Sequence, residues 1–184
     1  MATLVYQWSG DGIARITHAM EALGGPRAQT GLRRAINRTG EKAYTHVKRA
    51  LVKQMGLPSQ KLFSDDRALK TRRASVGHLA FEIQSSGKAI RAKEFRHRVG
   101  QKGITFYPWN VRHFIRSAFV IPAYGGNFYR RRTAKRFPLE ALYGPNINKE
   151  LVKDLSAAAF NATVAELPAR VEHEIRVITD GIVS

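Results

Sequence analysis

Residue types that perform catalysis or hold metals are few in this chain, and their spacing suits neither task. The 184 residues include no cysteine, which excludes thiol catalysis, disulfides, iron–sulfur clusters and Cys-based zinc sites. No Gly-Lys-Ser/Thr phosphate loop and no Gly-x-Ser-x-Gly elbow occurs. No histidine lies four residues from another, so the helical zinc pattern is absent; the six are His18, His46, His78, His97, His113 and His173.

Carboxylates, which metal-dependent nucleases use to hold hard cations, are scarce. Asp65-Asp66 is the only adjacent acidic pair, and it could converge with Glu82 and Glu94 on a divalent cation. We assign the pair instead to a helix start or a surface turn. The sequence therefore predicts a protein that is not an enzyme and needs no cofactor, with a nuclease as the third-ranked alternative.

The most distinctive chemical property is positive charge. The chain has 31 Lys and Arg against 14 Asp and Glu, a net charge of +17. Residues 31–136 hold 25 of the cations and 5 of the acids, whereas the two flanks together hold 6 cations and 9 acids. This asymmetry favours a polyanionic partner or an acidic protein surface, including the acidic ends of neighbouring protomers.

Two basic features concentrate this charge. In a helix predicted over residues 27–55, Leu32, Ile36, Thr39, Ala43, Val47 and Ala50 share one arc. The opposite arc carries a ladder of cations about 30 Å long: Arg34, Arg38, Lys42, Arg49 and Lys53. The second feature is an extended hairpin predicted over residues 124–136, in which aromatic residues precede Arg130, Arg131, Arg132, Lys135 and Arg136.

Other elements follow from periodicity and turn signals. We expect strands at residues 2–8, 74–86, 95–99, 104–109 and 114–121, and helices at 13–23 and 59–70. An extended segment, 137–146, closes in a Gly144-Pro145 turn. A second long helix then starts at an Asn148 cap with a Leu151, Leu155, Ala158 and Ala162 stripe, and Pro168 either interrupts it or begins a continuation.

Together these elements predict an α+β fold: a small antiparallel sheet packed against two long amphipathic helices, with the extended basic hairpin. We expect one domain over residues 1–184, with N-terminal helices at 9–56, the sheet and hairpin at 74–146 and C-terminal helices at 148–184. The hydrophobic fraction, 43%, and the length are sufficient for a core. Its predicted members are Leu32, Ile36, Val47, Leu79, Phe81, Ile83, Leu151 and Leu155.

The order of these segments resembles the minor tail protein Z family of long-tailed phages and prophages, also called tail completion proteins. The resemblance spans residues 10–165. The segments that carry it are residues 32–40, Ala43, Lys48-Arg49, residues 54–57, 69–74, 118–121 and 137–146, and Glu150-Leu151.

The resemblance implies a structural virion component at the head-proximal end of the tail, acting in tail assembly, head–tail joining or DNA delivery. It implies a homo-oligomeric ring, with a hexamer favoured, in contact with other tail or neck proteins. The alternative is a free, non-sequence-specific nucleic-acid-binding protein. No run of about 18 apolar residues is present, and no secretory signal is apparent, so we expect synthesis in the host cytoplasm and no membrane contact.

These considerations define two sets of candidate residues. The ten cations named above are candidate contacts to DNA in the tail lumen or to an acidic tail protein. The candidate contacts between subunits lie in the hairpin and in residues 142–146: Tyr124, Phe128, Tyr129, Leu142, Tyr143 and Pro145.

Overall fold

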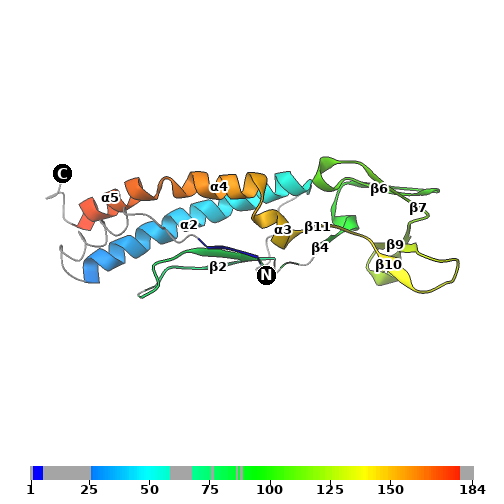
Figure 1. Ribbon diagram of the computed structural model, residues 1–184, viewed down its shortest axis with the longest axis horizontal. Coiled ribbons are helices and arrows are strands. Elements are labelled where there is room, and N and C mark those ends of the chain that lie inside the picture. The colour runs from blue at the N-terminus through cyan, green and yellow to red at the C-terminus, as the bar shows by residue number, and fades with distance from the viewer. Residues whose placement is uncertain are drawn as a thin grey trace.

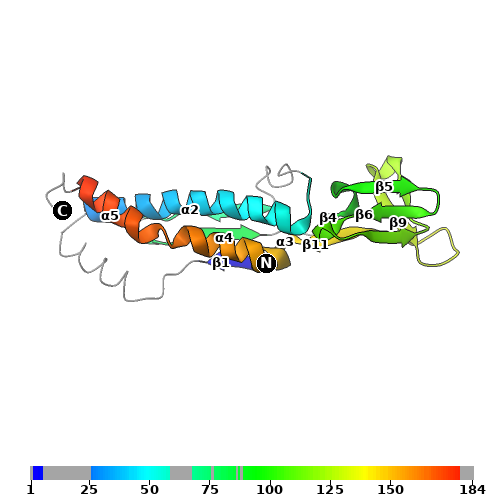
Figure 2. The same cartoon turned by 90° about the horizontal axis from the view of Figure 1, so that it is seen from above.

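The computed structural model of the protein describes residues 2–5, 26–58, 68–75, 77–85, 87 and 89–178. It confirms the α+β class, because helices lie against small antiparallel sheets. The molecule is long and narrow, with helices along one half and most strands in the other (Figure 1, Figure 2).

The described helices are α2 (Pro26–Met55), α3 (Ile147–Leu151), α4 (Asp154–Val164) and α5 (Leu167–Ile178). α2 confirms the helix predicted over residues 27–55, and α4 and α5 lie along it (Figure 2). The second long helix of the sequence prediction is instead three helices. Pro168 lies in the first turn of α5, where proline is tolerated, so it begins a continuation.

The two faces of α2 agree with the predicted pattern. The apolar arc is buried except at half-buried Ala50, and it continues through Leu51 and Met55, whereas the five ladder cations are exposed. The helix ends at Gly56, whose φ of 73° is the left-handed conformation that glycine adopts without strain. The Leu57 N–H donates to the Val52 carbonyl at 3.0 Å, which closes a Schellman-type end.

The strands form four antiparallel sheets. Sheet β1-β3-β2 lies in the helical half, and residues 89–146, which we call the β half, contain sheets β5-β6-β7 and β8-β9-β10 and the pair β4-β11. The bounds are β1 Ala2–Val5, β2 Leu69–Arg72, β3 Glu82–Ser85, β4 Ala89–Arg91, β5 His97–Gly100, β6 Gly103–Phe106, β7 His113–Arg116, β8 Phe119–Ile121, β9 Asn127–Arg131, β10 Leu139–Ala141 and β11 Tyr143–Asn146.

The basic hairpin is present with bounds shifted from 124–136, and the strands predicted at 95–99 and 104–109 form a second hairpin. β5 and β6 pair with Gly100 opposite Gly103, across the turn residues Gln101 and Lys102. β9 and β10 pair with Arg130 opposite Glu140, and residues 132–138 form the loop between them. Residues 124–126 belong to the preceding turn, between β8 and β9, where Gly125 and Gly126 have positive φ.

Several predicted strand and helix bounds are wrong. The helix predicted over 59–70 cannot reach residue 70, because residues 69–72 form β2. The strand predicted over 74–86 is limited to β3, since only a single bridge between Ser75 and His78 precedes it. The strand predicted over 114–121 is divided between β7 and β8 at Ser117, whose φ is 58°.

The approach to the C-terminal helices also differs from the prediction. Gly144-Pro145 lies inside strand β11 and makes no turn. The cap of α3 is Asn146, whose side-chain Oδ1 accepts the Asn148 N–H at 2.9 Å. Asn148 is therefore the donor in this cap and not the capping residue.

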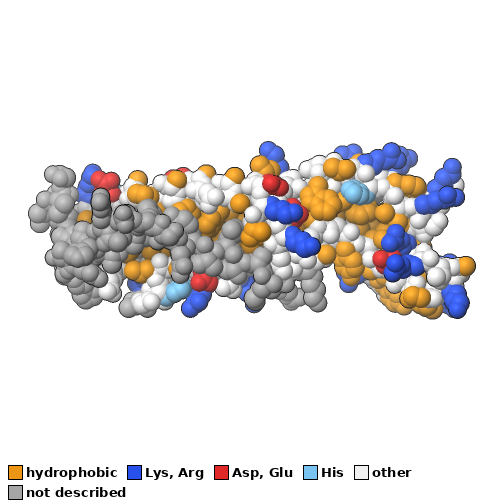
Figure 3. Space-filling view, viewed as in Figure 1, with side chains coloured by type: hydrophobic (Ala, Val, Ile, Leu, Met, Phe, Trp, Pro, Cys, Tyr) orange, Lys and Arg blue, Asp and Glu red, His pale blue; other side chains and the backbone are white. Residues whose placement is uncertain are grey.

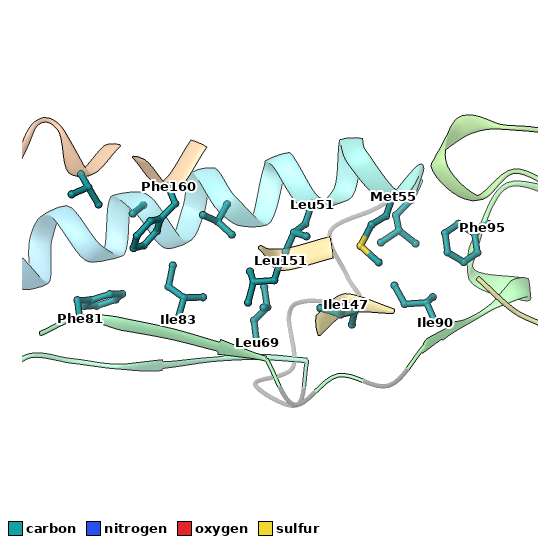
Figure 4. Packing of buried hydrophobic residues seen from close by; sticks show 14 of the residues in the cluster. Leu51, Met55, Leu69, Phe81, Ile83, Ile90, Phe95, Ile147, Leu151 and Phe160 are labelled. Atoms are coloured by element: carbon teal, nitrogen blue, oxygen red, sulfur yellow. The ribbon is translucent and has the colours of Figure 1, made fainter. Parts of the chain in front are cut away.

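One continuous hydrophobic core runs through both halves (Figure 4). Six predicted core residues are confirmed as buried: Leu32, Ile36, Val47, Phe81, Ile83 and Leu151. The prediction did not include the residues that extend the core into the β half, among them Ile90, Phe95, Ile104 and Phe106.

Leu79 and Leu155 were wrongly predicted as core residues, since they are 39% and 47% exposed. Leu79 precedes β3, so the alternation of that strand does not apply to it. For Leu155 the cause is the break after α3. Asp154 has a φ of 43° and restarts the helix in a new phase. The buried residues of α4 are Ser156, Phe160, Thr163 and Val164, and Ala158 and Ala162 of the predicted stripe are exposed.

A glycine sets how closely α2 approaches sheet β1-β3-β2. A Cβ added at Gly40 would overlap the ring of Phe81, which is itself 5% exposed. Glycine in a helix interior costs about 1 kcal/mol of helix propensity relative to alanine. Here it permits the helix to rest on the phenylalanine ring.

The helix predicted over 13–23, residues 6–8 of the first predicted strand, and the helix over 59–67 lie outside the described residues. Asp65-Asp66 lies there too. β1 confirms the start of the first strand.

Candidate functional site

The cation ladder of α2 divides into a paired part and an unpaired part. Arg38 lies 3.4 Å from Glu174 of α5, and Lys42 lies 2.5 Å from Glu166. Arg34, Arg49 and Lys53 have no ion pair within the described ranges. The sequence predicts all five cations on one face of the helix. The acids that pair with Arg38 and Lys42 are more than 120 positions away along the chain.

Cations of the β9–β10 hairpin are also partly compensated. Arg130 Nε donates to Glu140 Oε2 at 2.8 Å, and Arg132 lies 3.9 Å from the same carboxylate. The guanidinium of Arg131 lies 5.3 Å from the centre of the Phe119 ring. Residues 131–138 are all exposed, so the loop, with Lys135 and Arg136, remains accessible.

The hydrogen bond from Arg130 holds the pKa of the Glu140 carboxyl below its usual range. Because this folded-state pKa is lowered, the ion pair supports the hairpin above the ordinary glutamate pKa, about 4.3, and its support is lost as pH falls through the folded value. Arg130→Gln is expected to raise the pKa of Glu140 towards the ordinary value, as measured by NMR titration of the carboxyl carbon. Arg131→Gln is the matched control, because Arg131 contacts Phe119; an equal shift in both variants would contradict the assigned pair.

Only some of the side chains predicted to contact a neighbouring subunit are exposed. Tyr124 and Tyr143 are exposed, and Tyr129 packs edge-on against Tyr124 with ring centres 5.9 Å apart. Leu142 is half-buried against the core. Phe128 and Pro145 were wrongly assigned to this set, because both are buried inside the protomer.

Residues that carry the family resemblance mostly have structural roles. The Asn37 side chain donates to the Ala74 carbonyl at 3.1 Å and accepts the Ala74 N–H at 2.8 Å, which joins α2 to the chain after β2. Gln54 donates to the side chain of Glu150 at 2.8 Å. A Cβ at Gly144 would overlap the ring of Phe95. These contacts within the protomer account for the residue types at positions 37, 54 and 144, and none of the contacts indicates a ligand.

The sequence prediction missed one basic surface, the outer face of sheet β5-β6-β7. Arg98, Lys102 and Arg112 line a shallow groove of about 560 Å³ on it, beside the exposed ring of Phe114. Figure 3 shows Lys and Arg side chains gathered over the β half. The signal was present as alternation, with Arg98 on β5, Phe114 and Arg116 two residues apart on β7, and Arg112 just before that strand.

No group of three or more His, Asp or Glu residues that could hold a metal ion occurs in the part of the chain that the structure describes. Glu82 contacts Arg72 and His78, while Glu94 contacts Lys93, so these two carboxylates have separate partners. Among the same residues, no helix is both long and apolar enough to cross a bilayer.

Comparisons with known proteins found no family model, no curated protein and no solved structure that matches this chain.

Proposed function

We propose that the chain is a structural component of a phage tail, a tail completion protein that acts at the head-proximal end in tail assembly, head–tail joining or DNA delivery. The resemblance in segment order supports this assignment. The structural observation that carries it is the basic loop at residues 132–138 with the adjoining Arg131 of β9, a stretch of the β half that is exposed over its whole length. Such a loop is available to a neighbouring molecule in an assembly.

The partner of that loop supplies acidic groups from outside the protomer. In the described C-terminal segment, Glu166, Glu172 and Glu174 already pair with cations of the same chain, as does Glu140. Few acids of this described segment are therefore free to pair with a neighbouring protomer. This observation favours DNA or an acidic tail protein as the counterpart of the loop over the protein's own acidic ends.

A ring of such protomers requires a head-to-tail interface whose rotation closes. Tyr124 and Tyr143 are exposed aromatic residues of the β half, the kind of side chain that is enriched at protein interfaces. We place them in the subunit interface together with the basic loop.

The decisive experiment combines negative-stain imaging of the recombinant full chain with antibody labelling of phage particles from its source. We expect a closed ring and label at the head-proximal end of the tail. The variant Arg131→Ala, Arg132→Ala, Lys135→Ala and Arg136→Ala should reduce completed tails at least tenfold while its circular dichroism stays unchanged.

Lys149→Ala with Lys153→Ala is the control, because both lysines are exposed cations outside the β half. Unlabelled particles together with a recombinant chain that stays monomeric would overturn the tail assignment. That result would support the alternative, a free nucleic-acid-binding protein.

A further inference from the structure

The outer face of sheet β5-β6-β7 combines cations with an exposed aromatic ring. The register places Arg98 of β5, Thr105 of β6 and Phe114 of β7 in one row across the sheet. The next row on this face contains Gly100, Gly103 and Arg116. Two rows of one face are about 6.6 Å apart, and neighbouring strands about 4.8 Å.

The opposite face of the same sheet contacts the core through β6 and β7, whereas Val99 of β5 on that face is 52% exposed. Ile104 and Phe106 of β6 are buried, and Ile115 of β7 packs against the core cluster. Alternation along each strand therefore directs Arg98, Phe114 and Arg116 away from the core. The basic face is a fixed consequence of the register.

The cations on this face have no acidic partner within the described residues. Arg98, Lys102 and Arg112 line the groove, and no Asp or Glu is among its lining residues. None of the three forms an ion pair with any described carboxylate, in contrast to Arg38, Lys42, Arg130 and Arg132. Three uncompensated cations around one hollow favour a polyanion, since its counterions are released on binding.

The aromatic residue distinguishes a nucleic acid from other polyanions. Phe114 is 48% exposed and has no stacked or edge-on ring partner among the described residues. Arg112 precedes β7 and Arg116 ends it, each two residues from Phe114, so cations flank this ring on both sides along the chain. Bases stack on such rings while cations hold the phosphates.

We propose that this face binds single-stranded nucleic acid without sequence preference, with phosphates on Arg98, Lys102 and Arg112 and an unpaired base on Phe114. The site stands on the register, charge and exposure of these residues alone. It does not depend on the tail assignment, whose test reads ring formation and particle labelling.

The test measures binding of the full chain to a fluorescent 20-nucleotide oligo-dT by anisotropy over a range of NaCl concentrations. Arg98→Ala with Lys102→Ala and Arg112→Ala should weaken binding at least tenfold and lower the log–log salt slope by about 2, since each phosphate contact to a single strand contributes about 0.7. All three side chains are exposed, so the circular dichroism spectrum should not change.

The matched control removes the same charge from outside the β half: Lys70→Ala with Lys149→Ala and Lys153→Ala, three exposed cations that belong to neither set of candidate residues. We expect at most a twofold effect from this control. Equal losses in the two triple variants would show that binding reflects net charge only, and would overturn the proposed site. Should the sheet variant lose its fold, the three single Gln substitutions provide the same comparison.

Phe114→Ala separates base stacking from charge. We expect roughly tenfold weaker binding of oligo-dT, with the salt slope and the binding of a 20-base-pair duplex and of polyglutamate unchanged. Wild-type affinity for oligo-dT in this variant overturns the proposal. So does tighter binding of the wild-type protein to the duplex or to polyglutamate than to oligo-dT.

Discussion

Leu151→Ala is expected to lower the free energy of unfolding by about 2–5 kcal/mol, whereas Leu155→Ala should change it by less than about 0.5 kcal/mol. Both leucines belong to the stripe that periodicity predicted for one continuous helix. Leu151 is fully buried, beside Leu51 of α2 and Leu69 of β2 in Figure 4, whereas Leu155 is largely exposed. Removing the Leu151 side chain leaves a cavity that the surrounding helix and strand fill only in part.

Denaturant unfolding of the two variants, followed by circular dichroism, measures this difference. The pair is well matched, because the substitution is the same and the positions are four residues apart. Similar losses at both positions would mean that α3 and α4 form one helix, and would contradict the break at Asp154. A small loss at Leu151 would contradict its place in the core.

Gly40→Ala is expected to destabilise the protein by about 1–3 kcal/mol, even though alanine is the better helix former. The added methyl group would overlap the ring of Phe81, which packs below α2. Either the ring leaves its position or α2 moves off sheet β1-β3-β2. The overlap therefore outweighs the gain of about 1 kcal/mol in helix propensity.

A double-mutant cycle identifies the cause. Phe81→Ala alone should cost about 3–5 kcal/mol, but adding Gly40→Ala to it should cost nothing further or restore up to about 1 kcal/mol, because the clashing ring is gone. Additive losses in the cycle would exclude a contact between the two positions. Thermal unfolding monitored by circular dichroism is sufficient to distinguish the two outcomes.

Sequence reasoning succeeded for α2, where a long and regular hydrophobic pattern describes a single helix. α2 was predicted within one residue of its start and at its end, because thirty residues of periodicity and a terminal glycine agree. It failed where a short irregularity resets the pattern. Asp154 and Ser117 both have positive φ, and neither residue type announces that conformation, so the stripe of α4 and the division of β7 from β8 were missed.

For the candidate site, too, sequence reasoning predicted some features and missed others. Sequence counting located the charge in residues 31–136 and on one helix face and one hairpin. It could not show that Glu166 and Glu174 neutralise part of the helix face, nor that Arg130 is held by Glu140. It also treated Phe128 as a contact residue, although that side chain packs edge-on with His97 in the interior.

The sequence by itself determined the α+β class, the long basic helix, the two hairpins and a large excess of cations, because these depend on local periodicity, turn residues and composition. The tertiary structure alone decided which cations keep an unpaired charge and which aromatic residues remain exposed. Ion pairs and burial depend on residues that are distant in sequence, and strand register decides which face a side chain occupies. The register of β5, β6 and β7 places Arg98 and Phe114 in one row across the sheet, on either side of Thr105, and no spacing in the sequence predicts that row.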